Sequence, residues 1–208
     1  MLHRGKQGPE VKLSPPRERG EMSLEEAIAK RRSVRCYRRG PLSLSHLSQV
    51  LWAAQGITGA RGLRAAPSAG ATYPLEVFVL TGRDGVEGLD EGVYHYNVAN
   101  HSLELHKGGD LRGELSIAAR DEEFIVEAPV DIVICALYER TSWRYGRRAE
   151  RYVHMEVGHV GENIHLQAVA LGLAVVMVGA FEDERVRKLM DLAERVKPLY
   201  IIPLGKPR

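Results

Sequence analysis

The sequence has few cysteines and no long apolar run, and these two absences exclude several classes of protein. Its only cysteines, Cys36 and Cys135, are isolated and outside any C-x-x-C motif, so neither a disulfide framework nor a zinc ribbon is expected. No apolar stretch reaches the length of a transmembrane helix, and the polar N-terminus does not resemble a signal peptide. We therefore expect a cytoplasmic protein with no membrane partner.

The chain also has little net charge and lacks the fingerprints of nucleotide-binding folds. The formal net charge is +2, which does not indicate a general binder of nucleic acid. Neither G-x-G-x-x-G after a strand nor G-x-x-x-x-G-K-[ST] occurs, so tightly held NAD or ATP is not expected. The length of 208 residues suits a single domain over 21–208. The polar, Pro-rich residues 1–20 predict a flexible N-terminal arm.

Possible metal ligands crowd the segment 149–171, which is expected to form the longest helix. Two pairs, Glu156/His159 and Glu162/His165, each have the Glu-x-x-His spacing of di-iron bundles. Six residues separate the pairs, about 240° around a helix, so they face different directions. We therefore expect no metal site.

The densest charge cluster is the segment 30–39, which carries six cationic side chains in ten residues. Ser23 and Glu26 form a capping-box pattern, which predicts a helix beginning at residue 24. We expect this helix to continue toward Arg35, so that its last turn falls inside the cationic cluster.

On such a helix the side chains of Arg31, Arg32 and Arg35 would converge, because residues three and four apart share a face. Guanidinium groups in this arrangement suit a phosphate monoester, and Ser33 adds a short hydroxyl donor. The alternative needs no ligand, since cations in a last turn offset the negative end of the helix dipole. The spacing alone does not decide between them.

Small residues dominate the segment 56–74, which is predicted to be a loop. Such residues let the backbone approach a flat ligand, and Ser68 could donate a hydrogen bond to it; an ordinary connector is the alternative.

The segment 140–151 carries five arginines, whose spacing predicts a solvated helix face paired with Glu139 and Glu150. Binding of nucleic acid by this face is a second possibility. The arginines are Arg140, Arg144, Arg147, Arg148 and Arg151.

Four segments, taken in order, resemble the FMN-dependent nitroreductase superfamily. Residues 31–35 resemble its N-terminal phosphate-binding signature, and residues 67–74 resemble the Pro-Ser-Ala-Gly loop of its azoline (thiazole/oxazole) dehydrogenase branch. Residues 171–181 resemble the segment that passes the flavin ring, and residues 205–208 resemble the closing phosphate contacts. The resemblance spans about residues 11–208.

This resemblance implies an α+β protein with a nitroreductase-like fold, in which a central, mostly antiparallel sheet is flanked by helices and FMN lies at a homodimer interface. It implies contacts to the phosphate and ribityl chain from Arg31, Arg32, Ser33, Arg35, Lys206 and Arg208. The isoalloxazine ring would be bordered by Pro67, Ser68, Ala69 and Gly70, with the backbone N–H groups of Gly179 and Ala180 near its N5 atom.

The resemblance further implies hydride transfer between flavin N5 and a small organic substrate (a nitroaromatic, quinone or flavin), with NAD(P)H as a transient donor. Azoline dehydrogenases of the branch have a Lys-Tyr pair where this chain has Arg144-Tyr145. An arginine stays protonated and is a poor general base, which leaves Tyr145 as the candidate catalytic residue. Two alternatives stay open: oxidation of thiazoline or oxazoline rings in a modified peptide, and a non-catalytic module that binds nucleic acid or protein.

Overall fold

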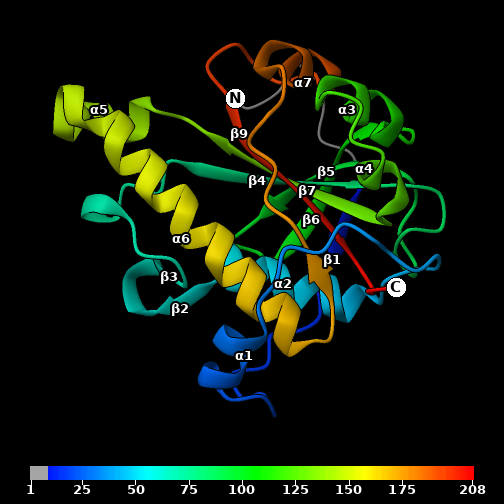
Figure 1. The fold of residues 1–208 in the computed structure, drawn as a ribbon. Helices are drawn as coiled ribbons and strands as arrows, with labels where there is room; N and C mark the ends of the chain where they lie inside the picture. The colour runs from blue at the N-terminus through cyan, green and yellow to red at the C-terminus, as the bar shows by residue number, and fades with distance from the viewer. Residues whose placement is uncertain (1–8) are drawn as a thin grey trace.

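A seven-stranded antiparallel sheet forms the centre of the computed structural model, which describes residues 9–208 (Figure 1). The strand order is β1-β6-β5-β4-β7-β9-β8, and every neighbouring pair is antiparallel. The strands are β1 (Glu10–Lys12), β4 (Leu75–Thr81), β5 (Gly92–Asn97), β6 (Ser102–Gly108), β7 (Val130–Ala136), β8 (Ala174–Val175) and β9 (Lys197–Gly205).

Helices cover both faces of this sheet (Figure 1). The strand β7 shows why, because Ile132 and Ile134 join one apolar cluster while Val133 and Cys135 join the other. A strand buried on both faces reads as a nearly continuous apolar run, and β7 is apolar except for Asp131. The predicted fold class is confirmed. One face carries α2 (Leu44–Gln55) and α6 (Ala149–Ala170); the other carries α3 (Arg112–Ala118), α4 (Phe124–Glu127) and α7 (Asp183–Leu189).

The 22-residue helix α6 is the longest element. It buries an apolar stripe, including Val153, Val160 and Ile164, against α2 and the sheet. Its N-terminal end follows α5 (Glu139–Tyr145) and the short 3-10 turn Gly146–Arg148. Its C-terminal half packs near α1 (Leu24–Lys30). The candidate site is arranged along this helix.

The helix at the N-terminus begins as predicted and ends earlier than predicted. Ser23 and Glu26 form the expected capping box, but α1 stops at Lys30. Arg31 leaves the helix with φ −54° and ψ 123°, and the N–H of Val34 donates to the carbonyl oxygen of Val175 at 3.0 Å. This bond to a distant strand replaces the last helical turn. The prediction that Arg31, Arg32 and Arg35 converge on a helix face is therefore wrong.

Two further local predictions are wrong. Gly146, at φ 54°, ends α5, so the arginines of 140–151 do not lie on a single helix face. Arg140 is paired with Glu76 instead of being solvated. The segment predicted as a loop also contains a small hairpin formed by β2 (Ile57–Gly59) and β3 (Leu63–Arg64).

The described part of the N-terminal arm lies on the body of the protein. The strand β1 pairs with β6, and the backbone N–H of Arg17 donates to Gln49 Oε1 at 2.8 Å. Residues 1–8 lie outside the described residues, and the division between an arm at 1–20 and a domain at 21–208 stays a prediction. Within residues 9–208, no helix has the length and apolar character needed to cross a membrane.

Candidate functional site

The segment that follows α1 meets the C-terminus at one edge of the fold. The N–H of Arg38 donates to the carbonyl oxygen of Lys206 at 2.9 Å, and the N–H of Arg208 donates to that of Cys36 at 3.2 Å. Tyr37 and Pro207 form an antiparallel bridge between these two bonds. The pairing therefore places Arg38 beside Lys206 and brings Arg208 to the basic segment after α1, without any helical spacing.

The cationic side chains at this junction lack counter-ions. Within the described part of the chain, no carboxylate forms an ion pair with Arg31, Arg35, Lys206 or Arg208, and Arg31 alone among them is half-buried. The Arg35 guanidinium lies 5.8 Å from the ring centroid of Phe124. Unpaired cations that gather at one place create a positive potential, which a phosphate group would neutralise with charge-assisted hydrogen bonds.

Arg32 differs from its neighbours, because its guanidinium is engaged with backbone. It donates to the carbonyl oxygens of Ala29 (3.2 Å) and Arg31 (2.6 Å), at the C-terminus of α1. This is the helix-end role that the sequence left open as an alternative. The Arg32 carbonyl oxygen lies 3.0 Å from Nε2 of His165, which fixes this segment against α6.

The Pro67–Gly70 segment forms a tight turn that is closed by side chains of α5. Gly70 has φ 59°, which favours glycine, and a Cβ there would lie 2.5 Å from the Tyr145 hydroxyl, so the Tyr145 side chain would have to shift. Arg144 Nη1 donates to the Gly70 carbonyl oxygen at 3.3 Å. The structure thus brings together the predicted loop and the predicted catalytic Tyr145.

The segment 179–180 offers free backbone donors. The bond between the Val178 N–H and the Ile201 carbonyl oxygen (2.9 Å) holds its start, and Tyr200 lies beside Gly179. Gly179 and Ala180 are both exposed, and their N–H groups have no acceptor among residues 9–208. Exposed donors of this kind are available to an acceptor atom of a ligand.

Two charged side chains that sequence reasoning did not connect support the loop. Glu76 Oε2 lies 2.6 Å from His95 Nε2, and Glu76 Oε1 lies 2.5 Å from Arg140 Nη2. Burial raises the pKa of Glu76, but His95 and Arg140 together hold it below its usual value. Arg140 also donates to the Tyr73 carbonyl oxygen at 3.0 Å, which anchors the chain after the loop.

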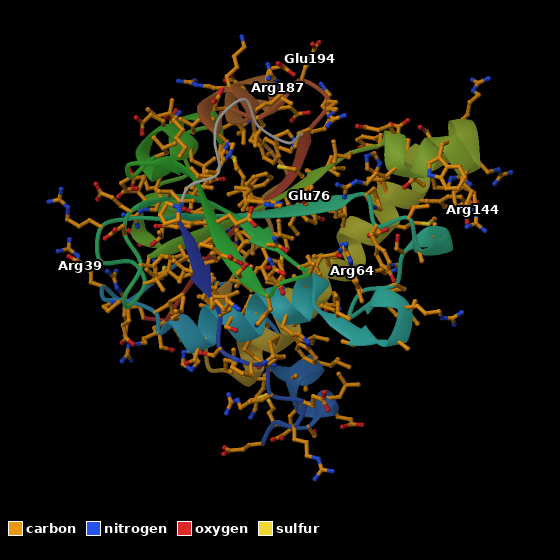
Figure 2. All side chains as sticks on the ribbon, turned by 180° about the vertical axis from the view of Figure 1, so that it is seen from behind. Arg39, Arg64, Glu76, Arg144, Arg187 and Glu194 are labelled. Atoms are coloured by element: carbon orange, nitrogen blue, oxygen red, sulfur yellow. The ribbon has the colours of Figure 1, made fainter. Side chains whose placement is uncertain are left out.

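A buried carboxyl group, also missed, lies behind the loop. Glu156 on α6 is 2% exposed, and its Oε1 atom has no hydrogen-bond partner in the described structure. Burial raises its pKa to about 7, although the Ser68 hydroxyl, the Gln55 amide and the Arg64 charge each lower it in part. Figure 2 shows Arg64 near the middle of the molecule, between Arg39 and Arg144 at its two ends. A carboxyl group with a pKa near 7 can hold or release a proton at neutral pH.

The loop and the end of α1 at Arg32 contact different sides of α6. The loop lies beside Glu156, whereas the cationic segment is fixed at His165. Nine residues separate these positions, about half a turn in direction and about 14 Å along the axis. Figure 1 likewise shows β2, β3 and the C-terminus on different sides of α6. The two groups therefore lie on opposite sides of this helix.

Two histidines of α6 lie within hydrogen-bond distance of other groups of the protein. His154 Nε2 lies 2.7 Å from the Tyr138 hydroxyl, and His165 is bonded to backbone. In the part of the chain that the structure describes, no three His, Cys, Asp or Glu side chains gather as a metal site requires.

Comparison with known proteins gives consistent matches across the chain. A sequence model of the Nitroreductase family matches residues 28–206. A Methanocaldococcus jannaschii protein named as a nitroreductase is 48% identical over 186 residues, which cover 89% of this chain and 92% of that protein. The microcin B17-processing protein McbC of Escherichia coli is 31% identical over 139 residues (65% of this chain, 51% of that protein). A Ralstonia eutropha crystal structure described as a nitroreductase superposes with a TM-score of 0.83 at 27% identity, covering 100% of this chain and 98% of that chain.

Proposed function

The chain belongs to the nitroreductase family of flavin oxidoreductases, and from this premise we propose that it is an FMN-dependent enzyme that uses NAD(P)H to reduce a small organic substrate. The observation that carries the proposal is the pairing of residues 36–38 with 206–208, which gathers cations without counter-ions. In this proposal Arg31, Ser33, Arg35, Lys206 and Arg208 hold the phosphate and ribityl chain. The Arg32 guanidinium instead donates to backbone carbonyl oxygens at the end of α1, and so helps to hold the phosphate-binding segment in place.

The remaining predicted residues have the chemistry that a flavin ring requires. A bound flavin supplies the hydride chemistry, while the protein binds it and orients it. The exposed N–H groups of Gly179 and Ala180 would donate near the ring, and the Pro67–Gly70 turn would border it. The nicotinamide donor would bind transiently at the same site, since the sequence carries no dinucleotide-binding fingerprint.

The proposed enzyme is a homodimer. The loop and the cationic junction lie on different sides of α6, so a ligand that touches both would take one from each of two chains. Apolar side chains also remain exposed, including Leu24 (61%) and Ile28 (56%) on α1 and Met155 (54%) on α6. Burial of such side chains in an interface stabilises association. We therefore place the flavin between the two subunits.

The visible spectrum of the purified protein tests this function. We expect the bands of oxidised flavin, which NADH or NADPH should bleach and a nitroaromatic or quinone should restore. A colourless protein that takes up no FMN contradicts the proposal. If such a protein also bound DNA with a steep dependence on salt, a nucleic-acid-binding module would replace it.

A second candidate function is oxidation of azoline rings in a modified peptide. It is favoured by the contacts of Arg144 and Tyr145 with Gly70, and by similarity to a protein named for processing of microcin B17. Because Arg144 is a poor base, Tyr145 would carry the proton. We expect Tyr145→Phe to lower turnover of an azoline peptide with less effect on quinone reduction. Unchanged azoline turnover in this variant would argue against the second function.

A further inference from the structure

The loop residues 70–73 have an unusual backbone conformation. Gly70, Ala71 and Tyr73 have φ values of 59°, 53° and 46°. A left-handed conformation strains any residue that has a Cβ atom, so Ala71 and Tyr73 adopt it only where surrounding groups hold them. Inside the loop, the N–H of Ala71 donates to the Ser68 carbonyl oxygen at 3.0 Å, and the N–H of Tyr73 donates to Ser68 Oγ at 2.9 Å. Further support comes from outside the loop.

Helix α5 supplies this support through three hydrogen bonds. Arg140 Nη1 donates to the Tyr73 carbonyl oxygen at 3.0 Å. Thr141, which is 1% exposed, places its hydroxyl oxygen 2.9 Å from that of Thr72. The bond from Arg144 to the Gly70 carbonyl oxygen, described above, lies one helical turn beyond Arg140. The loop can therefore move away from α5 only by breaking all three bonds.

The central sheet fixes the first of these three contacts through Glu76 of β4. Its Oε1 atom lies 2.5 Å from Arg140 Nη2, and its Oε2 atom lies 2.6 Å from Nε2 of His95 on β5. Both carboxylate oxygens are thus engaged, and the Glu76 side chain is only 10% exposed. Charge-assisted bonds of this kind hold a guanidinium in one orientation. Figure 2 shows Glu76 in the middle of the molecule and Arg144 toward one end. The chain of contacts therefore runs from the sheet through Glu76 and Arg140 to the loop.

We propose that Glu76 and Arg140 are positioning residues for the flavin reaction, which set the loop against the ring that it borders. The inference rests on the proposed function, in which the Pro67–Gly70 turn lies beside the flavin. Neither side chain contacts the reacting atoms: Arg140 acts through the loop, and Glu76 acts through Arg140. Such residues affect the rate because a displacement of about 1 Å in a site costs up to about a hundredfold.

Rapid-mixing kinetics of the flavin-loaded protein test the effect on the reaction. In Arg140→Gln the limiting rate at which NADPH or NADH bleaches the flavin should fall about tenfold, while the nicotinamide concentration that gives half this rate stays near the wild-type value. A change that only weakens the fold would not separate these two quantities. Glu139→Gln is the matched control, because it removes an exposed ion pair with Arg195 (3.7 Å) on the same helix, and it should alter neither.

A double-mutant cycle tests the order in which the two residues act. Glu76→Gln keeps the shape of the side chain and removes the charge that orients Arg140, so it should lower the bleaching rate in the same way. If Glu76 acts through Arg140, the double variant should bleach no more slowly than Arg140→Gln alone. A rate that falls by the product of the two single effects would show that Glu76 acts independently of Arg140, and would overturn this part of the proposal.

Hydrogen exchange of the flavin-free protein tests the loop itself. In Arg140→Gln and Glu76→Gln the backbone N–H groups of residues 71–73 should exchange at least about tenfold faster than in the wild type, while those of β7 keep the wild-type rate because the sheet stays folded. Glu139→Gln should leave both rates unchanged. Thr141→Val keeps the volume of the side chain and removes the bond to Thr72, so it should also accelerate exchange in the loop, and it serves if Arg140→Gln fails to fold.

The outcomes separate the two proposals. Wild-type exchange in the loop of both Arg140→Gln and Thr141→Val overturns the positioning role while leaving the oxidoreductase intact. Faster exchange with an unchanged bleaching rate also overturns it, because the contacts would then serve the fold alone. A wild-type protein that binds no flavin overturns the proposed function instead, and exchange in the flavin-free protein still decides whether Glu76 and Arg140 hold the loop.

Discussion

The N–H of Arg208 donates to the carbonyl oxygen of Cys36 at 3.2 Å, joining residues that lie 172 positions apart in the chain. Nothing in the local sequence of either segment specifies this bond. It forms because β9 ends beside the chain that leaves α1, and it places Arg208 and Lys206 next to the basic segment. The proposed phosphate site is thus a product of tertiary structure.

The buried Glu156 predicts that stability depends on pH. Its pKa rises from 4.5 to about 7 on folding, so the folded chain keeps its proton where the unfolded chain has lost it. The free energy of unfolding therefore falls as the pH rises above 4.5, and the loss reaches about 3 kcal/mol above pH 7. Glu156→Gln should therefore raise the free energy of unfolding relative to wild type at pH 8, with little difference at pH 4. Urea unfolding at both values measures this, and an equal difference at the two would contradict it.

Asp131 on β7 predicts a separate effect of the same sign. It is fully buried, neither of its carboxyl oxygens has a partner in the described structure, and burial raises its pKa well above the usual value. Above about pH 4, Asp131 ionises in the unfolded chain but stays protonated in the folded chain, so the folded state becomes less stable relative to the unfolded state. Asp131→Asn should raise Tm at pH 7, and the gain should shrink as the pH falls toward 4. The exposed change Asp90→Asn is the control, and a gain that grew on acidification would refute this explanation.

The turn at Gly70 predicts a difference between two glycine substitutions. Gly70 and Gly172 both have positive φ, 59° and 69°, so alanine costs about 1–2 kcal/mol of backbone strain at either position. Only at Gly70 would the added Cβ meet the Tyr145 hydroxyl, at 2.5 Å. Gly70→Ala should lower both stability and turnover, whereas Gly172→Ala should lower stability alone. Equal turnover in the two variants would show that the Gly70–Tyr145 contact has no part in activity.

The proposed interface predicts that a charge at Met155 prevents dimerisation. Met155 is 54% exposed on α6, and a carboxylate placed there would have to be desolvated in the interface. Met155→Glu should give a monomer by light scattering and should lose bound flavin. Ile117→Glu on α3, where the side chain is 45% exposed on the opposite face, should remain dimeric. A dimeric Met155→Glu protein that keeps its flavin would exclude α6 from the interface.

Local sequence chemistry predicted the beginnings of elements better than their ends. The capping box of Ser23 and Glu26 satisfies backbone groups only three residues apart, so it is readable from sequence and is confirmed. The end of α1 at Lys30 depends on the bond between Val34 and Val175, which no local pattern contains. The central strands β4 and β7 were predictable because they carry long, mostly apolar runs.

Long-range pairs explain what the sequence did not reveal about the candidate site. Arg140 looked like one member of a solvated stripe, yet it pairs with Glu76, 64 positions earlier. Glu156 was considered only as a metal ligand, and its importance depends on the burial that neighbouring elements impose. Motif resemblance named the loop and the terminal cations, but only the fold shows that they lie on different sides of α6.

The most direct test of the central claim compares the affinities of FMN and riboflavin, which differ only in the phosphate. If the cations of residues 31–35 and of the C-terminus bind that phosphate, FMN should bind at least about a hundredfold more tightly, since each charge-assisted hydrogen bond contributes about 1.5–3 kcal/mol. Arg35→Gln and Arg208→Gln should each reduce this ratio about tenfold or more, while the exposed change Lys188→Gln should leave it unchanged. Equal affinities for the two flavins, or a ratio that neither arginine variant alters, would contradict the account.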